Sequence, residues 1–439
     1  MKFYAIGGFS EVGKNMCAVE IKGEFVIFDM GVYMDKIIQL EDEDERNAPT
    51  QDLIRMGALP DDGILAGKKV LAIVLAHGHL DHIAAVPRLA EKYNCPIIGS
   101  DYTLEVVKKL LRDEKKKELE NALYVLNAGK TAKLSKNLSV EMVHITHSIP
   151  GSCLIALHTP EGIVTYLNDY KLDNNPTLGD KPNYKRYKEL AKKGIKLHIS
   201  ECVRVEEEAR TPPEYVAKVL VQDAIDRAYE DPSLVVITTF SSHIARLRTI
   251  LAANNGRRKV LFCGRSLSEY IKIAEKLGLM KLDGAEVFGR RKTIERAFDS
   301  IVSKDPSNCL VVCTGNQGEP NAVLSRIARK EFKFAFEKED QVIFSSEVIP
   351  SPINKANRFT LERDLREQGV RIMDHVHVSG HARREDHRDM IRMLKPQNII
   401  PSHGHMEKLS SFAALATEEG YFLGKNLHIL YDGAVIEIK

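Results

Sequence analysis

Long apolar runs are missing from this sequence of 439 residues. No stretch reaches the roughly eighteen consecutive apolar residues that a membrane-spanning helix needs, so we expect no membrane segment. Residues 1–8 are interrupted too early for a secretory signal and instead predict a first strand. Low-complexity segments and repeats of fixed period are also missing, which leaves a globular chain long enough for two or three domains.

Paired cysteines and an excess of one charge are missing too. The seven cysteines are odd in number and scattered, and no two of them stand in a Cys-x-x-Cys pair. They predict reduced, mostly buried thiols and a cytoplasmic protein. The formal net charge is +2, so a polyanionic partner would have to meet local basic patches rather than a global field.

One hexapeptide is unusually rich in metal-binding side chains. Residues 77–82 read His-Gly-His-Leu-Asp-His and follow the apolar run 70–76, which predicts a buried strand. Residues 83–93 have apolar side chains at helical spacing, so the hexapeptide is predicted to be a loop at the end of a strand. Four such side chains cannot all bind one ion, which indicates two neighbouring metals that accept imidazole and carboxylate, such as zinc. The alternative is a surface loop that happens to be rich in histidine.

Further strands end in polar residues of the same kind. The apolar runs at 138–147, 163–167 and 196–200 end at or just before His147, Asp169 and Glu201. Because one loop cannot surround two metals, ligands from several strand ends are what such a centre requires. Asp29 ends a hairpin-like pattern at 19–31, although a turn-forming role explains it equally well.

A second α/β region follows Glu201. A helix is predicted over 211–229, and strands at 234–239, 260–263, 309–314 and 341–345 alternate with helices at 243–254 and 266–277, which favours a parallel sheet. Three basic clusters lie within this region. Each by itself is typical of solvated surface, but together they could line a nucleic-acid groove. They are Arg246 with Arg248, Arg257-Arg258-Lys259, and Arg290-Arg291-Lys292.

Histidines return near the end of the chain. His375 and His377 alternate on a predicted short strand, where they are either structural or close to substrate, and His381 follows in a turn. His403 follows a predicted strand at 398–400. Helices are predicted over 385–394 and 406–417, and closing strands over 427–431 and 434–438.

These residues together resemble a known family. Asp29, the 77–82 loop, His147 and Asp169 resemble, in order and spacing, the metallo-β-lactamase fold, and the α/β insertion resembles the β-CASP domain of its nucleic-acid-cutting members. Segments 7–16, 314–320 and 377–382 resemble ribonuclease J, and the chain stops at Lys439 like the shorter archaeal form. Two segments depart from that pattern: Glu201-Cys202-Val203-Arg204 stands for Asp-Ser-Thr-Asn, and Gly404-His405 for Gly-Glu.

The resemblance implies an α/β fold, an αββα sandwich with an inserted domain. The expected boundaries are 1–203 and 382–439 for the sandwich and 204–381 for the β-CASP domain. It also implies two zinc ions, with manganese or magnesium assisting or substituting. The expected ligands are His77, His79 and His147 for one ion, Asp81, His82 and His403 for the other, and Asp169 as a bridge. Asp29 would orient a ligand. Sequence alone leaves His144 as a rival to His147; the strand-end position and the following Ser-Ile-Pro favour His147.

The same resemblance implies catalytic roles. His381 would be the general acid that protonates the leaving 3′ oxygen, and Glu201 would orient it and keep its proton. Asp81 belongs to the catalytic set as well as to the ligands. The alternative for His381 and Glu201 is a structural histidine–carboxylate pair.

The implied activity is 5′→3′ degradation of RNA that carries a 5′ monophosphate, by a homodimer without a membrane partner. The phosphate pocket is expected at Phe240, Ser241 and Ser242, opposite His377, Val378, Ser379, Gly380 and His381, because a helix N-terminus there favours an anion. Ordinary N-capping is the rival explanation for the two serines. The rival functions are an endoribonuclease or DNA nuclease of the same branch and, from another class, a non-catalytic scaffold subunit of an RNA-processing complex.

Overall fold

Two mixed β-sheets form the first of two compact units in the computed structural model, which describes residues 1–40, 48–116 and 119–439. This unit comprises residues 1–174, 180–211 and 380–439. Its first sheet has the order β19 (Val435–Glu437), β1 (Lys2–Gly7), β2 (Met16–Ile21), β3 (Glu24–Phe28), β4 (Val70–Val74), β5 (Ile97–Gly99) and β6 (Leu123–Val125). Its second has the order β18 (Ile399–Ser402), β11 (Ile195–Glu201), β10 (Gly162–Leu167), β9 (Cys153–Thr159), β8 (Ser139–His144) and β7 (Thr131–Lys133).

The two sheets share one apolar core. Alternating side chains of β1–β4 meet those of β8–β11 in a single buried cluster, as expected for strands with one face toward a facing sheet. Phe28 of β3 stacks on Tyr166 of β10, with ring centroids 5.2 Å apart. This packing brings the ends of β3 and β10 together, and both strands lead directly into the site described below.

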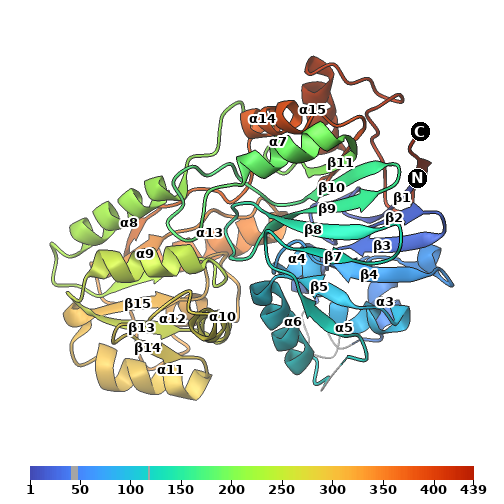
Figure 1. Ribbon diagram of the computed structural model, residues 1–439. Coiled ribbons are helices and arrows are strands. Elements are labelled where there is room, and N and C mark those ends of the chain that lie inside the picture. The colour runs from blue at the N-terminus through green and yellow to red at the C-terminus, as the bar shows by residue number, and fades with distance from the viewer. Residues whose placement is uncertain (41–47, 117–118) are drawn as a thin grey trace. The chain divides into compact units, whose positions relative to one another are not determined.

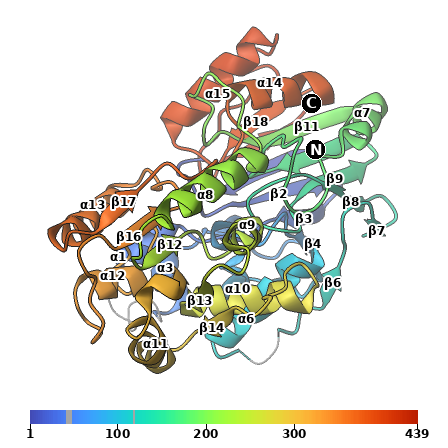
Figure 2. The same cartoon turned by 90° about the vertical axis from the view of Figure 1, so that its left-hand side faces the viewer.

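Helices cover both outer faces and complete an αββα sandwich (Figure 1). In chain order, the helices between the strands of the first sheet are α1 (Met34–Gln39), α3 (Thr50–Arg55), α4 (Leu80–Ile83), α5 (Val86–Leu89) and α6 (Asp101–Asp113), with short turns η1 (Gly63–Leu65) and η2 (Glu91–Tyr93). On the second sheet lie α7 (Tyr184–Lys193), α14 (Arg384–Leu394) and α15 (Met406–Glu418); Figure 2 shows the last two beside β18. The α/β sandwich predicted from the sequence is confirmed.

The second unit comprises residues 175–179 and 212–379. Its sheet has the order β14 (Glu286–Phe288), β13 (Lys259–Cys263), β15 (Cys309–Cys313), β12 (Val235–Thr238), β16 (Gln341–Phe344) and β17 (Arg371–Met373), and every neighbouring pair is parallel. Its helices are α8 (Glu214–Ala228), α9 (Ile244–Asn254), α10 (Arg265–Lys276), α11 (Arg291–Ala297), α12 (Val323–Ala328) and α13 (Pro352–Glu367), with short turns η3 (Phe298–Val302) and η4 (Pro306–Asn308). The alternating pattern of the sequence correctly predicted this parallel sheet.

Three local predictions are wrong. Residues 83–93 do not form one helix: α4 ends at Ile83, and α5 begins anew with Pro87 in its first turn, because proline cannot donate to a preceding turn. No strand covers 375–378 in the described chain, since β17 ends at Met373 and His375 has φ +62°. Residues 427–431 are likewise not a strand, because the segment meets β18 at a single bridge of Leu427.

Among the residues that the structure describes, no helix is both long enough and apolar enough to cross a bilayer.

Candidate metal centre

Strand ends of both sheets deliver the side chains of one cluster. Asp29 follows β3, Asp169 follows β10 and His403 follows β18. All three have left-handed backbones, with φ of 57°, 60° and 60°. This conformation is uncommon for residues other than glycine, although Asn, Asp and His adopt it more readily than most. It turns each side chain out of the strand direction and into the site, a form of strain that concentrates at functional positions.

The predicted loop after β4 is only partly a loop. His77 and His79 lie in it, but Asp81 and His82 belong to the first turn of α4, for which His79 is the N-cap residue. His77 and His79 precede this turn and belong to one candidate ligand set, whereas Asp81 and His82 lie on it and belong to another. Gly31 makes this arrangement possible, because a Cβ at that position would lie 1.6 Å from the carbonyl oxygen of Asp81.

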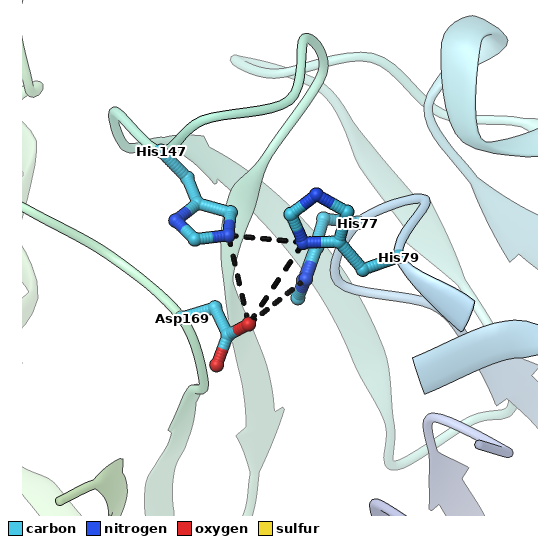
Figure 3. Close-up of side chains that lie close together, drawn as sticks. All are labelled: His77, His79, His147 and Asp169. Carbon is cyan, nitrogen blue, oxygen red and sulfur yellow. Dashed lines mark hydrogen bonds and ion pairs between the residues drawn. The ribbon is translucent and has the colours of Figure 1, made fainter. Parts of the chain in front are cut away.

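The first candidate ligand set contains His77, His79, His147 and Asp169 (Figure 3). His77 Nε2 lies 3.4 Å and His147 Nε2 3.5 Å from Asp169 Oδ2. His79 Nδ1 lies 3.1 Å from His147 Nε2 and 4.0 Å from the same carboxylate oxygen. The four ligand atoms therefore face a common point.

The second candidate set contains Asp81, His82, Asp169 and His403. His82 Nε2 lies 3.5 Å from Asp81 Oδ2 and 3.4 Å from Asp169 Oδ2. His403 Nε2 lies 3.6 Å from Asp81 Oδ2 and 3.3 Å from Asp169 Oδ1. Asp169 is the residue that the two sets share, as a bridging ligand would be.

These residues fit a pair of metal ions. A tetrahedral ion with bonds of about 2.0–2.1 Å separates its ligand atoms by about 3.3–3.4 Å, close to most of the distances above. Within the described chain, neither ring nitrogen of the buried His77 has a hydrogen-bond partner, nor does Asp169 Oδ1. Buried polar atoms without partners are costly, and an ion bound by these ligands would satisfy them.

The electrostatics agree with cation binding. Burial lowers the pKa of His77 to about 3, and the neighbouring His82 adds to this effect, so the His77 ring is neutral, as a ligand imidazole must be. Burial opposes the charge of Asp169, but His403, His82 and other histidines outweigh it and hold its pKa well below the usual range. For His82, burial favours the neutral ring, yet the three surrounding carboxylates raise its pKa well above the usual value. The site thus carries surplus negative charge that cations would offset.

Hydrogen bonds orient the ligand rings. His82 Nδ1 donates to Asp29 Oδ2 at 2.7 Å, and the Tyr166 hydroxyl donates to the same oxygen at 2.8 Å. The Ala76 amide donates to Asp29 Oδ1 at 2.8 Å, which ties Asp29 to the start of the histidine loop. Asp29 therefore makes the contacts expected of a residue that orients a ligand.

His144 and His147, the two candidates for a ligand, lie in different surroundings. β8 ends at His144, whose Nε2 contacts the carbonyl oxygen of Asp180 at 2.8 Å, away from both sets. His147 lies three residues further on, beyond the isolated bridge between Thr146 and Lys171. Its Nδ1 donates to the carbonyl oxygen of Gly380 at 2.7 Å, which leaves Nε2 directed at Asp169.

His381 and Glu201 form a pair beside the second oxygen of Asp169. His381 Nδ1 lies 3.0 Å from Glu201 Oε2 and 3.8 Å from Asp169 Oδ1. The other oxygen of Glu201 accepts from the Tyr170 amide at 2.9 Å, so the carboxylate is held in place. Burial by itself lowers the pKa of His381, but Glu201 and Asp169 outweigh burial and raise it to about 9.

The residues expected to hold a phosphate fall in different parts of the chain. Phe240 and His377 lie close in the second unit, with ring centroids 6.3 Å apart, and Ser241 Oγ lies 2.9 Å from Ser266 Oγ. Ser242 does not cap α9, whose N-cap residue is His243. Val378 and Ser379 are buried in the same unit. Gly380 belongs to the first unit, where a Cβ would meet the ring of His147 at 3.1 Å.

Two arginines of the predicted basic clusters have structural roles instead. Arg246 is fully buried; its Nε pairs with Glu214 at 2.9 Å and its Nη1 donates to the Ser345 carbonyl oxygen at 3.0 Å. Arg258 is also buried, with its guanidinium 4.0 Å from the ring centroid of Tyr229. Charge counts in sequence cannot reveal such burial. Exposed basic residues remain at 248, 257, 259 and 290–292.

Asn15 and Asn168 were given no role by the sequence, although both contact the centre. His403 Nδ1 lies 2.8 Å from Asn15 Oδ1, and Asn168 Nδ2 donates to the same oxygen at 3.2 Å. The single signal for Asn15 was its place in segment 7–16, which carries the family resemblance.

Comparison with known proteins agrees with this architecture. Three family models match: the metallo-beta-lactamase superfamily at residues 12–200, the beta-CASP domain of ribonuclease J at 233–361, and a Zn-dependent metallo-hydrolase RNA specificity domain at 369–429. A solved protein of unknown function from Enterococcus faecalis has a TM-score of 0.68 at 18% identity, with 99% of both chains covered, which supports the fold alone.

Full-length relatives define the family. Ribonuclease J of Pyrococcus abyssi is 46% identical over all of this chain and 97% of its own length. Ribonuclease J of Methanocaldococcus jannaschii is 45% identical over all of this chain and 99% of its own. Ribonuclease J of Synechocystis is 31% identical over all of this chain and 66% of its own. The chain therefore belongs to the ribonuclease J family of metal-dependent nucleases.

Proposed function

We propose that this protein is a two-zinc 5′→3′ exoribonuclease that acts on RNA with a 5′ monophosphate. The observation that carries the proposal is the pair of ligand sets that share Asp169, with His381 and Glu201 beside the shared carboxylate. A hydrolytic attack on a phosphodiester needs an activated water, compensation of charge and a proton for the leaving oxygen, and this arrangement offers a group for each. The names of the family's relatives and of the matched RNA specificity domain support RNA as substrate.

The metals would be held by the two sets in the division given above. His77, His79 and His147 would bind one ion, Asp81, His82 and His403 the other, and Asp169 both. Two zinc ions bound there would activate a water for attack at phosphorus and offset the charge of the phosphodiester. Imidazole with carboxylate suits zinc, and manganese or magnesium would assist or substitute.

The chain's own residues perform the remaining steps. Asp29 and the Gly380 carbonyl hold the rings of His82 and His147 in the orientation that leaves their Nε2 atoms available to an ion. Glu201 holds His381 through Nδ1, so His381 Nε2 is the atom that carries a proton to the leaving 3′ oxygen. Asp81 would contribute to catalysis as a ligand of the second ion, together with His82 and His403.

The 5′ phosphate is proposed to bind at Phe240, Ser241 and Ser242 together with 377–381. These serines follow β12, and polar groups at the carboxyl ends of parallel strands are the usual location of ligands in such sheets. A homodimer is proposed from the family, and light scattering that gave the mass of a single chain would contradict it. The seven free, buried cysteines favour a reducing compartment, hence the cytoplasm.

One digestion tests direction, end preference and metal dependence together. RNA labelled at the 3′ end is incubated with the holoenzyme after preparation with either a 5′ monophosphate or a 5′ triphosphate, each with and without a chelator. We expect faster loss of the monophosphorylated RNA, a label that survives in progressively shorter fragments, and no loss with chelator. Equal decay of both RNAs would contradict the pocket, and persistence of full cleavage in chelator would contradict the metal centre.

Endonucleolytic cleavage is the second candidate, because the ligand sets do not distinguish internal from terminal phosphodiesters. Discrete 3′-labelled fragments from a 5′-blocked RNA, or linear products from an internally labelled circular RNA, would favour it. A matched DNA substrate tests sugar preference in the same assay.

A further inference from the structure

Asn15 lies at the contact between three segments of the centre. It is the last residue of the loop between β1 and β2 and is 1% exposed. Its backbone amide donates to the Asp81 carbonyl oxygen at 3.0 Å, and its own carbonyl oxygen accepts from the Gly31 amide at 3.0 Å. Its side chain contacts three residues of the second ligand set: Nδ2 lies 3.1 Å from the Asp81 carbonyl oxygen and 3.1 Å from His82 Nε2, and Oδ1 lies 2.8 Å from His403 Nδ1.

The orientation of the Asn15 side chain follows from one obligate acceptor. The atom 3.1 Å from the Asp81 carbonyl oxygen must be a donor, because a carbonyl oxygen can only accept; it is therefore Nδ2. Oδ1 consequently faces His403 Nδ1 at 2.8 Å. An amide oxygen can only accept, so His403 Nδ1 carries the hydrogen.

That assignment fixes the tautomer of His403. With the hydrogen on Nδ1, Nε2 carries a lone pair, and Nε2 is the atom 3.3 Å from Asp169 Oδ1 and 3.6 Å from Asp81 Oδ2. His82 and His147 are fixed in the same sense by Asp29 and by the Gly380 carbonyl. Asn15 is thus the counterpart of these two groups for His403.

A buried chain of hydrogen bonds holds the Asn15 oxygen in place. Asn168 Nδ2 donates to Asn15 Oδ1 at 3.2 Å, and Ser402 Oγ donates to Asn168 Oδ1 at 2.8 Å. Asn168 and Ser402 directly precede Asp169 and His403 in the chain. Loss of the Asn15 amide would leave two buried donors, on His403 and Asn168, without their acceptor, which is costly and would free the His403 ring to rotate.

We propose that Asn15 is the positioning residue of the Asp81–His82–His403 set, where it selects the His403 tautomer and anchors the Asp81 backbone. The proposal rests on the metal assignment of the proposed function, which it extends to a residue outside the ligand sets. Residues that orient a metal ligand typically contribute about 10–100-fold in metal affinity. The consequence is selective: the ion in the second set should weaken, and the ion in the first set should not.

The direct test measures metal binding by Asn15→Ala. Apoprotein of wild type and variant is titrated with Co2+, followed by its visible absorption, and with Zn2+ by calorimetry. We expect two equivalents in wild type, and in the variant one site of unchanged affinity and one site about 10–100-fold weaker. Two sites of wild-type affinity in Asn15→Ala would overturn the proposal, and so would equal weakening of both.

Asn121→Ala is the matched control. Asn121 is also a buried asparagine, 5% exposed, and its Nδ2 donates to the carbonyl oxygens of Ala90 and Cys95, outside both ligand sets. It should lower the melting temperature of the apoprotein to a similar extent and leave both metal affinities unchanged. A control that lost one ion as Asn15→Ala does would show a general loss of stability instead, and would overturn the specific role.

Two further measurements do not depend on the alanine variant folding. Asn15→Asp keeps an acceptor for His403 Nδ1 but loses the Nδ2 donor that faces the Asp81 carbonyl oxygen and His82 Nε2. We therefore expect its second site to be intermediate in affinity; wild-type affinity would exclude a role for this donor. In wild-type protein with ¹⁵N-labelled histidine, long-range ¹H–¹⁵N correlation should identify His403 as the Nδ1–H tautomer. An Nε2–H tautomer would overturn the proposal. Failure of wild type to bind two ions would instead contradict the proposed function.

Discussion

The two ligand sets differ in how their rings are held before any ion binds. In the second set both histidines have a side-chain acceptor behind them, Asp29 for His82 and Asn15 for His403. In the first set, His147 donates a hydrogen bond to a main-chain carbonyl oxygen. Among the described residues, neither ring nitrogen of His77 has a hydrogen-bond partner. Both rings of the second set are therefore oriented by side chains, whereas His147 of the first set is oriented by the main chain. We expect the second set to bind its ion more tightly.

Asp169→Asn should have the largest effect, because both ligand sets share Asp169 and neither should keep its ion without it. Asp169 contacts ligand atoms of both sets, and a neutral amide in its place removes the bridging charge. We expect loss of both ions and background cleavage, measured by metal analysis after dialysis and by decay of 5′-monophosphorylated RNA. Retention of one full equivalent would show that a single set uses this carboxylate.

His381→Ala should have the next largest effect, and should leave the difference in metal affinity between the two ligand sets unchanged. Loss of a general acid typically costs about 10²–10⁴-fold in turnover, while the ions remain bound because His381 belongs to neither set of metal ligands. Single-turnover cleavage and metal analysis of the same preparation measure both quantities. His144→Ala is the control, since His144 contacts the Asp180 carbonyl oxygen instead. Wild-type turnover in His381→Ala would assign the His381–Glu201 pair a structural role.

Asp29→Asn should reduce or reverse the difference in affinity between the two sets, because it weakens the second set alone. The neutral side chain keeps an acceptor for His82 but loses the carboxylate charge that makes the ring a stronger ligand. We expect about 10–100-fold weaker binding of one ion, seen by Co2+ titration. Asp62→Asn is a control with a similarly buried aspartate, which pairs with Lys92 outside the centre. Weakening of both ions would contradict an effect confined to the second set.

Tyr166→Phe should have the smallest effect. It removes a hydroxyl that donates to Asp29 at 2.8 Å and accepts from Asn168 at 2.8 Å, one step further from the ions. A hydrogen bond to a charged group contributes about 1.5–3 kcal/mol to the free energy of unfolding, so we expect a loss of that order in denaturant unfolding. Affinity for the second ion should change by no more than the Asp29 variant changes it. A larger change would make Tyr166, and not Asp29, the main support of His82.

Strand ends were the part of the site that sequence could predict. The runs before His77, Asp169 and Glu201 are short, apolar and rich in β-branched residues, and such runs become buried strands with their polar followers at a common edge. This regularity is local in sequence and is therefore visible in a single chain. It also explains why the parallel sheet of the second unit was predicted correctly from alternation alone.

Long-range hydrogen bonds were the part that sequence could not predict. Asn15 and His403 are 388 residues apart, and nothing in the neighbourhood of either indicates the other. The prediction that Arg246 belongs to an exposed basic cluster was wrong for a related reason. Its burial depends on Glu214 and on the end of β16, which meet only in the folded chain. Likewise, the helical start at Leu80 depends on main-chain contacts of α4 with residues 30–32, which no periodicity reveals.

Gly31 sets the distance between two segments of the centre. The turn after β3 and the first turn of α4 touch main chain to main chain, with no room for a Cβ between them. The spacing of these two segments is therefore set by contact between backbone atoms. The position of Asp81 relative to the turn after β3 thus depends on one residue having no side chain.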